Sequence, residues 1–127
     1  MDKKEVAARF ASLGFPASEC WVQTGAAMVM YGIRERTHDI DMGCTKALAD
    51  RIAASGAPWV TLPDGRRKYT IGGDVEVSEN WSPGTVTVID GVPVVSPEDV
   101  IACKRALGRE KDFRDIALIE AWLKNRE

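Results

Sequence analysis

Three segments in the first half of the sequence have the residue pattern of helices. Residues 3–13 carry apolar side chains about one turn apart and are followed by a glycine, so we predict a helix there. Residues 45–56 show a similar pattern, with Thr45 as the expected N-cap and a glycine at the end. Between them, residues 25–32 are mostly small or unbranched and favour a short helix.

Strand-like segments lie between these helices and dominate the middle of the chain. They are short, rich in β-branched or aromatic residues, and several of them alternate apolar with polar residues. The dipeptide Asp90-Gly91, between two valine-rich runs, is a strong signal for a tight hairpin. We expect strands within residues 20–24, 39–44, 59–71, 74–81 and 85–96, with turns at 63–65 and 90–91 dividing the two longer ranges.

The end of the chain returns to the helical pattern. Ser96 is a good N-cap, Pro97 suits a first helical position, and Gly108 marks the end of that helix. Residues 109–125 carry an apolar stripe that predicts a final helix, formed by Phe113, Ile116, Ile119 and Leu123. The order of elements predicts an α+β fold, a mixed β-sheet with flanking helices that ends in two helices.

Length and composition restrict the class of protein. The 127 residues predict a single domain over positions 1–127. Hydrophobic residues make up 45% of the chain, and the formal net charge of −2 argues against a protein that binds polyanions over its whole surface. No apolar run approaches the roughly 20 residues that span a bilayer, and residues 1–15 lack the apolar segment of a signal peptide. We therefore expect no membrane association.

The cysteines and the histidine give no zinc-binding pattern. Cys20, Cys44 and Cys103 are widely spaced, no CxxC pair exists, and His38 is the only histidine. This spacing excludes the usual structural zinc sites. Free thiols are typical of a reducing compartment, so we expect a cytoplasmic protein.

The segment "DIDMGC" holds two aspartates around one isoleucine. On a strand, Asp39 and Asp41 point to one face, while Ile40 and Met42 point into the core. Two carboxylates side by side repel each other and call for a cation, and Mg²⁺ prefers oxygen ligands. A solvated strand face explains the pair equally well, so both interpretations stay open on these residues alone.

A second acidic strand follows in "GGDVEVSEN". Asp74 and Glu76 share one face of this strand, and Val75 and Val77 share the other. If the two acidic strands are neighbours, a third carboxylate joins the aspartates; the alternative is an ordinary half-exposed edge strand. We favour Glu76, which lies between two valines, over Asp74, which follows two glycines.

Gly25 stands where a strand gives way to a helix, and the small Ala26 follows it. Backbone N–H groups at such a helix start can approach a phosphate closely, although tight packing explains a glycine there as well. Arg34 and Arg36 lie in the connection that leads to the aspartates. We expect one of the two arginines to contact phosphates.

The stretch "TGAAMVMYGIRERTHDIDMGC" resembles the nucleotidyltransferase superfamily of the DNA polymerase β type, which carries a Gly-Ser or Gly-Gly helix start, a spacer and Asp-x-Asp on a strand. The similarity is to small bacterial nucleotidyltransferases of the lincosamide, aminoglycoside and abortive-infection toxin kind. In such proteins a lysine and an Arg-x-Lys-Asp-x-x-Asp run recur after the core, which "SPEDVIACKRALGREKDFRDIALI" resembles. The matching positions here are Lys104, Arg109, Lys111, Asp112 and Asp115. The resemblance extends from about Cys20 to Ile119.

The resemblance implies a magnesium-dependent transfer of NMP from an NTP, such as ATP, to a hydroxyl of an unknown acceptor. Asp39, Asp41 and Glu76 would be the catalytic residues, with Asp74 as the other candidate metal ligand. Two Mg²⁺ ions would bind the triphosphate and activate the hydroxyl for in-line attack. The nucleotide-binding residues implied are Gly25, Ala26, Arg34, Arg36, Lys104, Arg109 and Lys111.

Two features of the sequence depart from the family pattern. Ala26 stands where a serine is usual, and the sequence ends without a separate acceptor-binding domain. The alternative is therefore a catalytically weak or inactive nucleotide-binding or toxin–antitoxin interaction module of the same fold. A third interpretation is a structural domain with fortuitous acids. Nothing in the sequence specifies the acceptor or indicates nucleic acid, and a homodimer is compatible with it.

Further residues near these motifs have plainer interpretations. We expect His38 to point away from the carboxylates by strand alternation, and the basic run at 65–69 to be a solvated turn. Lys111 and Asp115 are spaced for an ion pair along one helix. Among the tryptophans, Trp81 is the candidate for stacking on a ligand.

Overall fold

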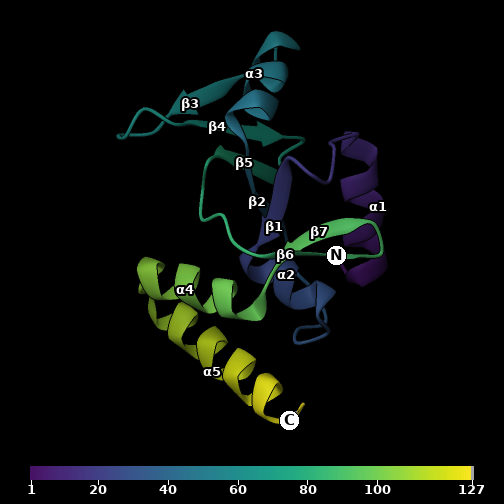
Figure 1. Cartoon of the computed structure of the whole chain (residues 1–127), viewed down its shortest axis with the longest axis vertical. Coiled ribbons are helices and arrows are strands. Elements are labelled where there is room, and N and C mark those ends of the chain that lie inside the picture. The colour runs from purple at the N-terminus through teal and green to yellow at the C-terminus, as the bar shows by residue number, and fades with distance from the viewer. Residues whose placement is uncertain (127) are drawn as a thin grey trace.

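A seven-stranded mixed sheet runs through the molecule, and helices flank it (Figure 1). The computed structural model describes residues 1–126. The strands are β1 (Cys20–Gln23), β2 (Ile40–Cys44), β3 (Trp59–Thr61), β4 (Arg67–Ile71), β5 (Val75–Glu79), β6 (Val86–Ile89) and β7 (Val92–Val95). The helices are α1 (Lys3–Leu13), α2 (Thr24–Met30), α3 (Lys46–Ala54), α4 (Pro97–Leu107) and α5 (Glu110–Lys124). The prediction of an α+β fold that ends in two helices is confirmed.

The two acidic strands lie next to each other at the centre of the sheet. The strand order is β3-β4-β5-β2-β1-β7-β6. Strand β2 pairs in parallel with β5 and antiparallel with β1. In the β2–β5 register, Asp41 lies opposite Glu76 and Met42 lies opposite Val77. Because paired residues share a face, the acids gather on one side of the sheet and the apolar residues on the other.

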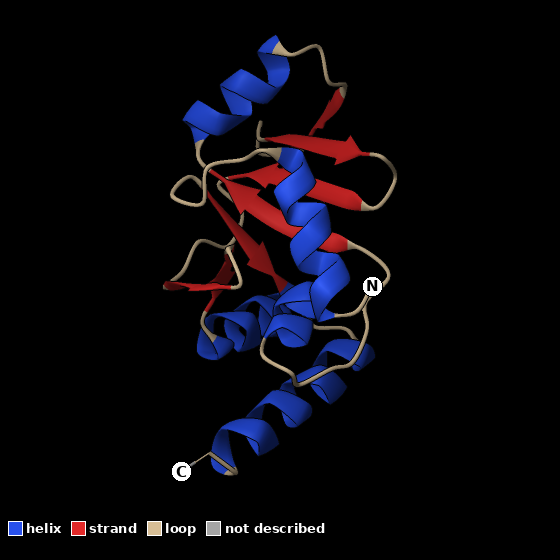
Figure 2. Ribbon diagram, turned by 90° about the vertical axis from the view of Figure 1, so that its right-hand side faces the viewer, coloured by secondary structure: helices blue, strands red, loops and turns tan. Residues whose placement is uncertain are grey.

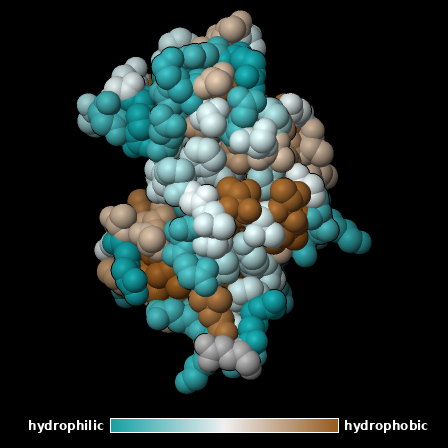
Figure 3. Space-filling view, viewed as in Figure 1, coloured by the Kyte–Doolittle hydropathy of each residue, from teal (hydrophilic) through white to brown (hydrophobic). Residues whose placement is uncertain are grey.

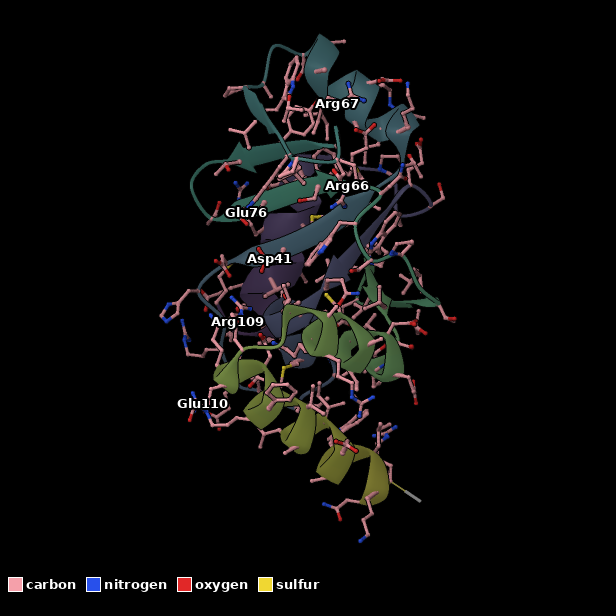
Figure 4. The ribbon with its side chains drawn as sticks, turned by 90° about the vertical axis from the view of Figure 1, so that its left-hand side faces the viewer. Asp41, Arg66, Arg67, Glu76, Arg109 and Glu110 are labelled. Carbon is pink, nitrogen blue, oxygen red and sulfur yellow. The ribbon has the colours of Figure 1, made fainter. Side chains whose placement is uncertain are left out.

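The apolar face of these strands is covered by the helices α1 and α2. Figure 2 shows α1 lying across the sheet, and its Val6 and Phe10 are buried. Ile40 and Met42 of β2 are fully buried in the same core, as the alternation of "DIDM" predicts. The opposite face bears the acids, so packing on one side fixes where they point (Figure 4).

The helix boundaries follow the capping signals of the sequence. The hydroxyl of Ser96 accepts a hydrogen bond from the backbone of Asp99, and Gly108 ends α4 in the left-handed conformation with φ +66°. Thr45 caps α3 in the same way as Ser96 caps α4. In the part of the chain that the structure describes, no helix is both long and apolar enough to cross a bilayer.

The helices α4 and α5 form a hairpin at one end of the molecule (Figure 1). Ile116 and Ile119 of α5 are buried, but Phe113 is 54% exposed. The predicted apolar stripe is therefore wrong at Phe113. The polar residues Asp112 and Asp115 occupy the buried face instead. Figure 3 shows some apolar surface at this end of the molecule and more over its middle.

Candidate functional site

A cavity of about 750 Å³ opens on the acidic face of the sheet. Figure 4 shows Asp41 and Glu76 on that face, with Arg66 on the side of β4 and Arg109 at the α4–α5 turn. The predicted site residues that line it are Gly25, Arg34, Arg36, Asp39, Asp41, Glu76, Lys104, Arg109 and Lys111. The fold thus brings residues from the two ends of the chain together around the acids.

Three carboxylates share one wall of this cavity. Asp41 and Glu76 are register partners on adjacent parallel strands, and Asp39 directly precedes β2. On the other flank of β2, Gln23 of β1 is the register partner of Asp41. The spacing of the two strand-borne acids is therefore set by the pairing of the sheet rather than by a loop.

Asp41 lies in an unfavourable environment for a negative charge. Burial raises the pKa of its carboxyl group, and the neighbouring charges of Asp39 and Glu76 raise it further. A hydrogen bond from the Thr24 hydroxyl to Asp41 Oδ2, 3.3 Å long, and the ammonium of Lys68 act in the opposite direction. The local excess of negative charge favours binding of a cation.

Part of that charge is already balanced by a lysine. Lys68 of β4 places its Nζ atom 3.3 Å from Oε2 of Glu76. Both side chains are partly exposed to the cavity. The predicted solvated turn at residues 65–69 is wrong from Arg67 on, because β4 begins there. Lys68 of β4 and Arg66, directly before β4, both line the cavity.

The donor set of this wall suits Mg²⁺. Within residues 1–126, no three His, Cys, Asp or Glu side chains are grouped as ligands of one metal ion. Mg²⁺, however, usually binds through one or two carboxylates together with substrate phosphates rather than in an all-protein cage. Asp41, with Asp39 or Glu76 beside it, supplies oxygen ligands of that kind. The residues therefore fit a magnesium ion that binds together with a triphosphate.

Asp74 lies outside the cavity. The guanidinium of Arg9 on α1 donates to both of its carboxylate oxygens, with Nε–Oδ2 and Nη2–Oδ1 distances of 2.9 Å. These hydrogen bonds lower the pKa of Asp74. Asp74 precedes the first residue of β5, so strand alternation does not place it beside Glu76. The structure therefore places Glu76, and not Asp74, with the aspartates.

A buried charge network lies behind the α4–α5 side of the cavity. Lys104 is only 4% exposed, and its Nζ lies 2.9 Å from Asp115 Oδ2 and 3.5 Å from Asp112 Oδ1. Arg34 also binds Asp115, at 2.9 Å, and Arg109 binds Asp112, at 2.6 Å. The Arg109 guanidinium lowers the pKa of Asp112 to about 2, against the penalty of burial. The network ties three cationic side chains of the cavity wall to α5.

This network replaces the ion pair predicted within α5. Asp115 binds Arg34 and Lys104 rather than Lys111, which lines the cavity and is exposed. The buried face of α5 turns Asp115 toward α4 and the loop after α2. Lys111 and Arg36 are exposed cations of the wall that lie outside this network, and Arg36 makes one long contact of 3.4 Å with Glu5.

The two predicted site residues at the strand–helix junction, Gly25 and Ala26, lie in different environments. Gly25 lines the cavity, and a Cβ atom there would lie 2.9 Å from Nη1 of Arg34 and 3.1 Å from Oγ1 of Thr37, so these two side chains would have to shift to admit a larger residue. Ala26 is buried in the core and does not line the cavity. Its predicted contact with a nucleotide therefore has no support in this arrangement.

His38 is exposed and lines the cavity, so the prediction that it points away is wrong. It lies before β2 begins, where strand alternation does not apply. Sequence reasoning also missed polar and apolar lining residues that no motif marks, namely Thr24, Thr37, Ser78, Leu62 and Leu107. For Thr24 the signal was its place directly before Gly25.

Trp81 lines the cavity from the loop that follows β5. Two side chains of β1 hold this loop: Trp21 Nε1 donates to the carbonyl of Trp81 at 2.7 Å, and Gln23 Nε2 donates to the carbonyl of Ser82 at 3.1 Å. Gly43 leaves room for this contact, because a Cβ there would lie 2.1 Å from Trp21 Nε1. The position of Trp81 is therefore fixed by the central strands.

The cysteines play no part in this site. All three thiols are buried and free. Burial raises the pKa of Cys20 to about 12 and that of Cys44 to about 11. The shifts disfavour the reactive thiolate form of both at neutral pH, and neither side chain lines the cavity.

Models of known families, curated proteins and solved structures give no match to this chain. The resemblance to nucleotidyltransferases therefore rests on the residues quoted above.

Proposed function

We propose that this protein is a magnesium-dependent nucleotidyltransferase that moves NMP from an NTP to a hydroxyl of an acceptor. One observation carries the proposal. Asp41 and Glu76 are register partners on adjacent parallel strands, with Asp39 beside them, on the wall of a cavity that cationic side chains surround. Acids at the centre and cations at the rim are what binding of a metal–triphosphate complex requires.

The size and charge of the cavity support a nucleotide ligand. A volume of about 750 Å³ falls within the range of small-molecule sites. The exposed Lys111 and Arg36 would meet the phosphates first. Arg34 and Arg109 carry a second set of donors, and their acidic partners on α5 hold them at the wall. Trp81 offers an aromatic surface to a base.

The acids have separate roles in this proposal. Asp39 and Asp41 would hold the metal ion. When bound there, the ion would neutralise charge on the phosphates and lower the pKa of an acceptor hydroxyl. Glu76 would accept the proton of that hydroxyl, because it lies directly beside Asp41 on the neighbouring strand. Thr37 supports Asp39 through a hydrogen bond from its hydroxyl to the Asp39 carbonyl, 3.1 Å long.

The ion pair between Lys68 and Glu76 favours a second candidate function, a nucleotide-binding module without chemistry. A lysine bound to the proposed base competes with proton transfer. In this alternative the cavity still binds an NTP together with its metal ion, and the acids contact that ion without taking part in a reaction. Ala26, in place of the usual serine, points in the same direction.

Label transfer tests the proposal. The protein is incubated with each α-³²P-labelled NTP, Mg²⁺ and total cellular RNA, protein or small-molecule extract as acceptor. We expect transfer by the wild-type chain and its loss in Asp41→Asn and Glu76→Gln. Asp74→Asn is the matched control, because Asp74 belongs to the same acidic segment but lies outside the cavity. Transfer that survives Asp41→Asn would refute the site.

Thermal shift separates the two candidate functions. A ligand that binds only the folded chain raises its melting temperature. If an NTP with Mg²⁺ stabilises the wild-type chain while no acceptor fraction becomes labelled, the binding module is supported. If Glu76→Gln binds the nucleotide as well as the wild type but fails to transfer, the enzyme is supported.

A further inference from the structure

We infer that Thr24 is a positioning residue that holds the carboxylate of Asp41 for metal binding, an inference that rests on the proposed function. Thr24 lies where β1 passes into α2 and is 6% exposed at the cavity wall. Its hydroxyl donates to Asp41 Oδ2 at 3.3 Å. It thereby orients the carboxylate of Asp41 through one of its two oxygens.

The backbone of Thr24 is strained. Its φ angle is +52°, in the left-handed region that glycine, asparagine and aspartate adopt far more readily than a β-branched residue. Such outliers persist only where the surrounding structure holds them, and they cluster at functional sites. A glycine would satisfy this backbone without strain, so the threonine is explained by its side chain.

A buried amide holds the strained residue in place. Oε1 of Gln23, which is fully buried, accepts a hydrogen bond from the backbone N–H of Thr24 at 3.1 Å. The same amide donates through Nε2 to the carbonyl of Ser82. Gln23 is also the register partner of Asp41. The junction is therefore fixed from two strands and one loop, which leaves the hydroxyl of Thr24 aimed at Asp41.

Thr24 supplies a hydroxyl at a junction where the chain offers few others. Ala26, two residues on, carries no hydroxyl and is buried in the core. The hydroxyl of Thr37 is directed to the carbonyl of Asp39. The two threonines thus contact different aspartates: Thr37 binds the backbone of Asp39, and Thr24 binds the side chain of Asp41.

Three substitutions at this position separate the hydroxyl from the backbone. Thr24→Ser keeps the hydroxyl and a Cβ atom. Thr24→Ala removes the hydroxyl and keeps the Cβ atom. Thr24→Gly removes both the hydroxyl and the strain. The readouts are the melting temperature and the affinity for Mn²⁺–tripolyphosphate by calorimetry, a probe that does not depend on the preferred base.

We expect Thr24→Ser to bind the probe like the wild type. Thr24→Ala and Thr24→Gly should both lose roughly two- to tenfold in affinity, the range of one hydrogen bond. Thr24→Gly should melt at a higher temperature than Thr24→Ala, because glycine relieves the left-handed backbone. The two variants would then bind the probe equally weakly but differ in melting temperature, so the loss of affinity would not follow the loss of stability.

Other outcomes overturn the inference. A purely structural role predicts that affinity follows stability, so that the glycine variant binds better than the alanine variant. Wild-type affinity in both variants would also refute the positioning role while leaving the proposed function intact. If the wild-type chain itself fails to bind Mn²⁺–tripolyphosphate, the proposed function fails, and the inference fails with it.

Discussion

Replacement of Asp112 by asparagine tests whether the buried charge network stabilises the fold. Asp112 is fully buried on α5 and accepts hydrogen bonds from the guanidinium and the backbone N–H of Arg109. Lys104 lies 3.5 Å from it and keeps Asp115 as a partner at 2.9 Å after the substitution. The variant therefore removes one negative charge without leaving the buried lysine alone.

The pKa of Asp112 gives the magnitude. Its ordinary value of 3.8 falls to about 2 in the folded chain, which corresponds to about 2 kcal/mol in favour of the charged form. Arg109 is 52% exposed, so solvent screening makes this an upper figure. For a chain of this length, a loss of that size lowers the melting temperature by about 5–10 °C.

Urea unfolding at two pH values measures the effect. Because the folded pKa lies below the unfolded one, the stabilisation is fully present above about pH 5 and is lost as the pH falls through about 2. At pH 3 roughly half of it remains. The difference in free energy of unfolding between wild type and Asp112→Asn should therefore shrink from pH 7 to pH 3.

Glu110→Gln is the matched control on the same helix. Glu110 pairs with Arg114 at 3.3 Å, but both side chains are largely exposed. Such surface pairs contribute little, so its stability should change by well under 1 kcal/mol. Equal stability of Asp112→Asn and wild type at pH 7, or a difference that does not shrink on acidification, would refute the role assigned to Asp112.

Three further predictions concern two residues of the cavity wall and one residue that supports the loop of Trp81. Asp41→Asn should raise the melting temperature at pH 7, because burial and the acidic neighbours of Asp41 disfavour its negative charge in the folded chain. This destabilisation by the charge is absent below pH 3.8 and grows as the pH rises through the raised pKa of Asp41. The increase in melting temperature should therefore vanish in acid. Lys68→Met should raise the affinity for Mn²⁺ several-fold in calorimetry, since Glu76 loses the cation 3.3 Å away. Gly43→Ala should cost about 1–3 kcal/mol in urea unfolding and change the tryptophan fluorescence, because the new Cβ would lie 2.1 Å from Trp21 Nε1.

Each of these has an outcome that contradicts it. Asp41→Asn that melts below the wild type at pH 7 would mean that its hydrogen bond outweighs the charge penalty. For Lys68, the control is Lys46→Met, an exposed lysine that pairs with Asp50 outside the cavity; equal Mn²⁺ affinity in both variants removes Lys68 from the site. Unchanged fluorescence in Gly43→Ala would show that the loop of Trp81 does not depend on this contact.

Local patterns predicted most of the fold. Caps, glycines and β-branched runs act within a few residues, so the bounds of the helices and strands were readable. The same locality explains the failure at Phe113. Its helical spacing is correct, but the contacts of Asp112 and Asp115 with Lys104 on another helix decide which face of α5 is buried.

The candidate site was predictable where it depends on alternation within one strand. Asp41 and Glu76 lie on the face expected of them. The choice between Glu76 and Asp74 was open, because it depends on Arg9 of α1, far away in the sequence. The role of Lys68 was hidden for the same reason: its partner comes from a different strand.

The register of β2 and β5 also has a consequence for how the chain folds. Between these partner strands the chain runs through α3, β3 and β4. Asp41 and Glu76 therefore become neighbours only when the two ends of this intervening segment have come together. Contacts between residues far apart in the sequence form late and slowly, because closing the loop between them costs entropy before the contact contributes any stabilisation. Partly folded chains would carry unpaired acidic strands and no cavity. If the chain binds a metal–triphosphate complex as proposed, that binding during refolding would report completion of the central sheet.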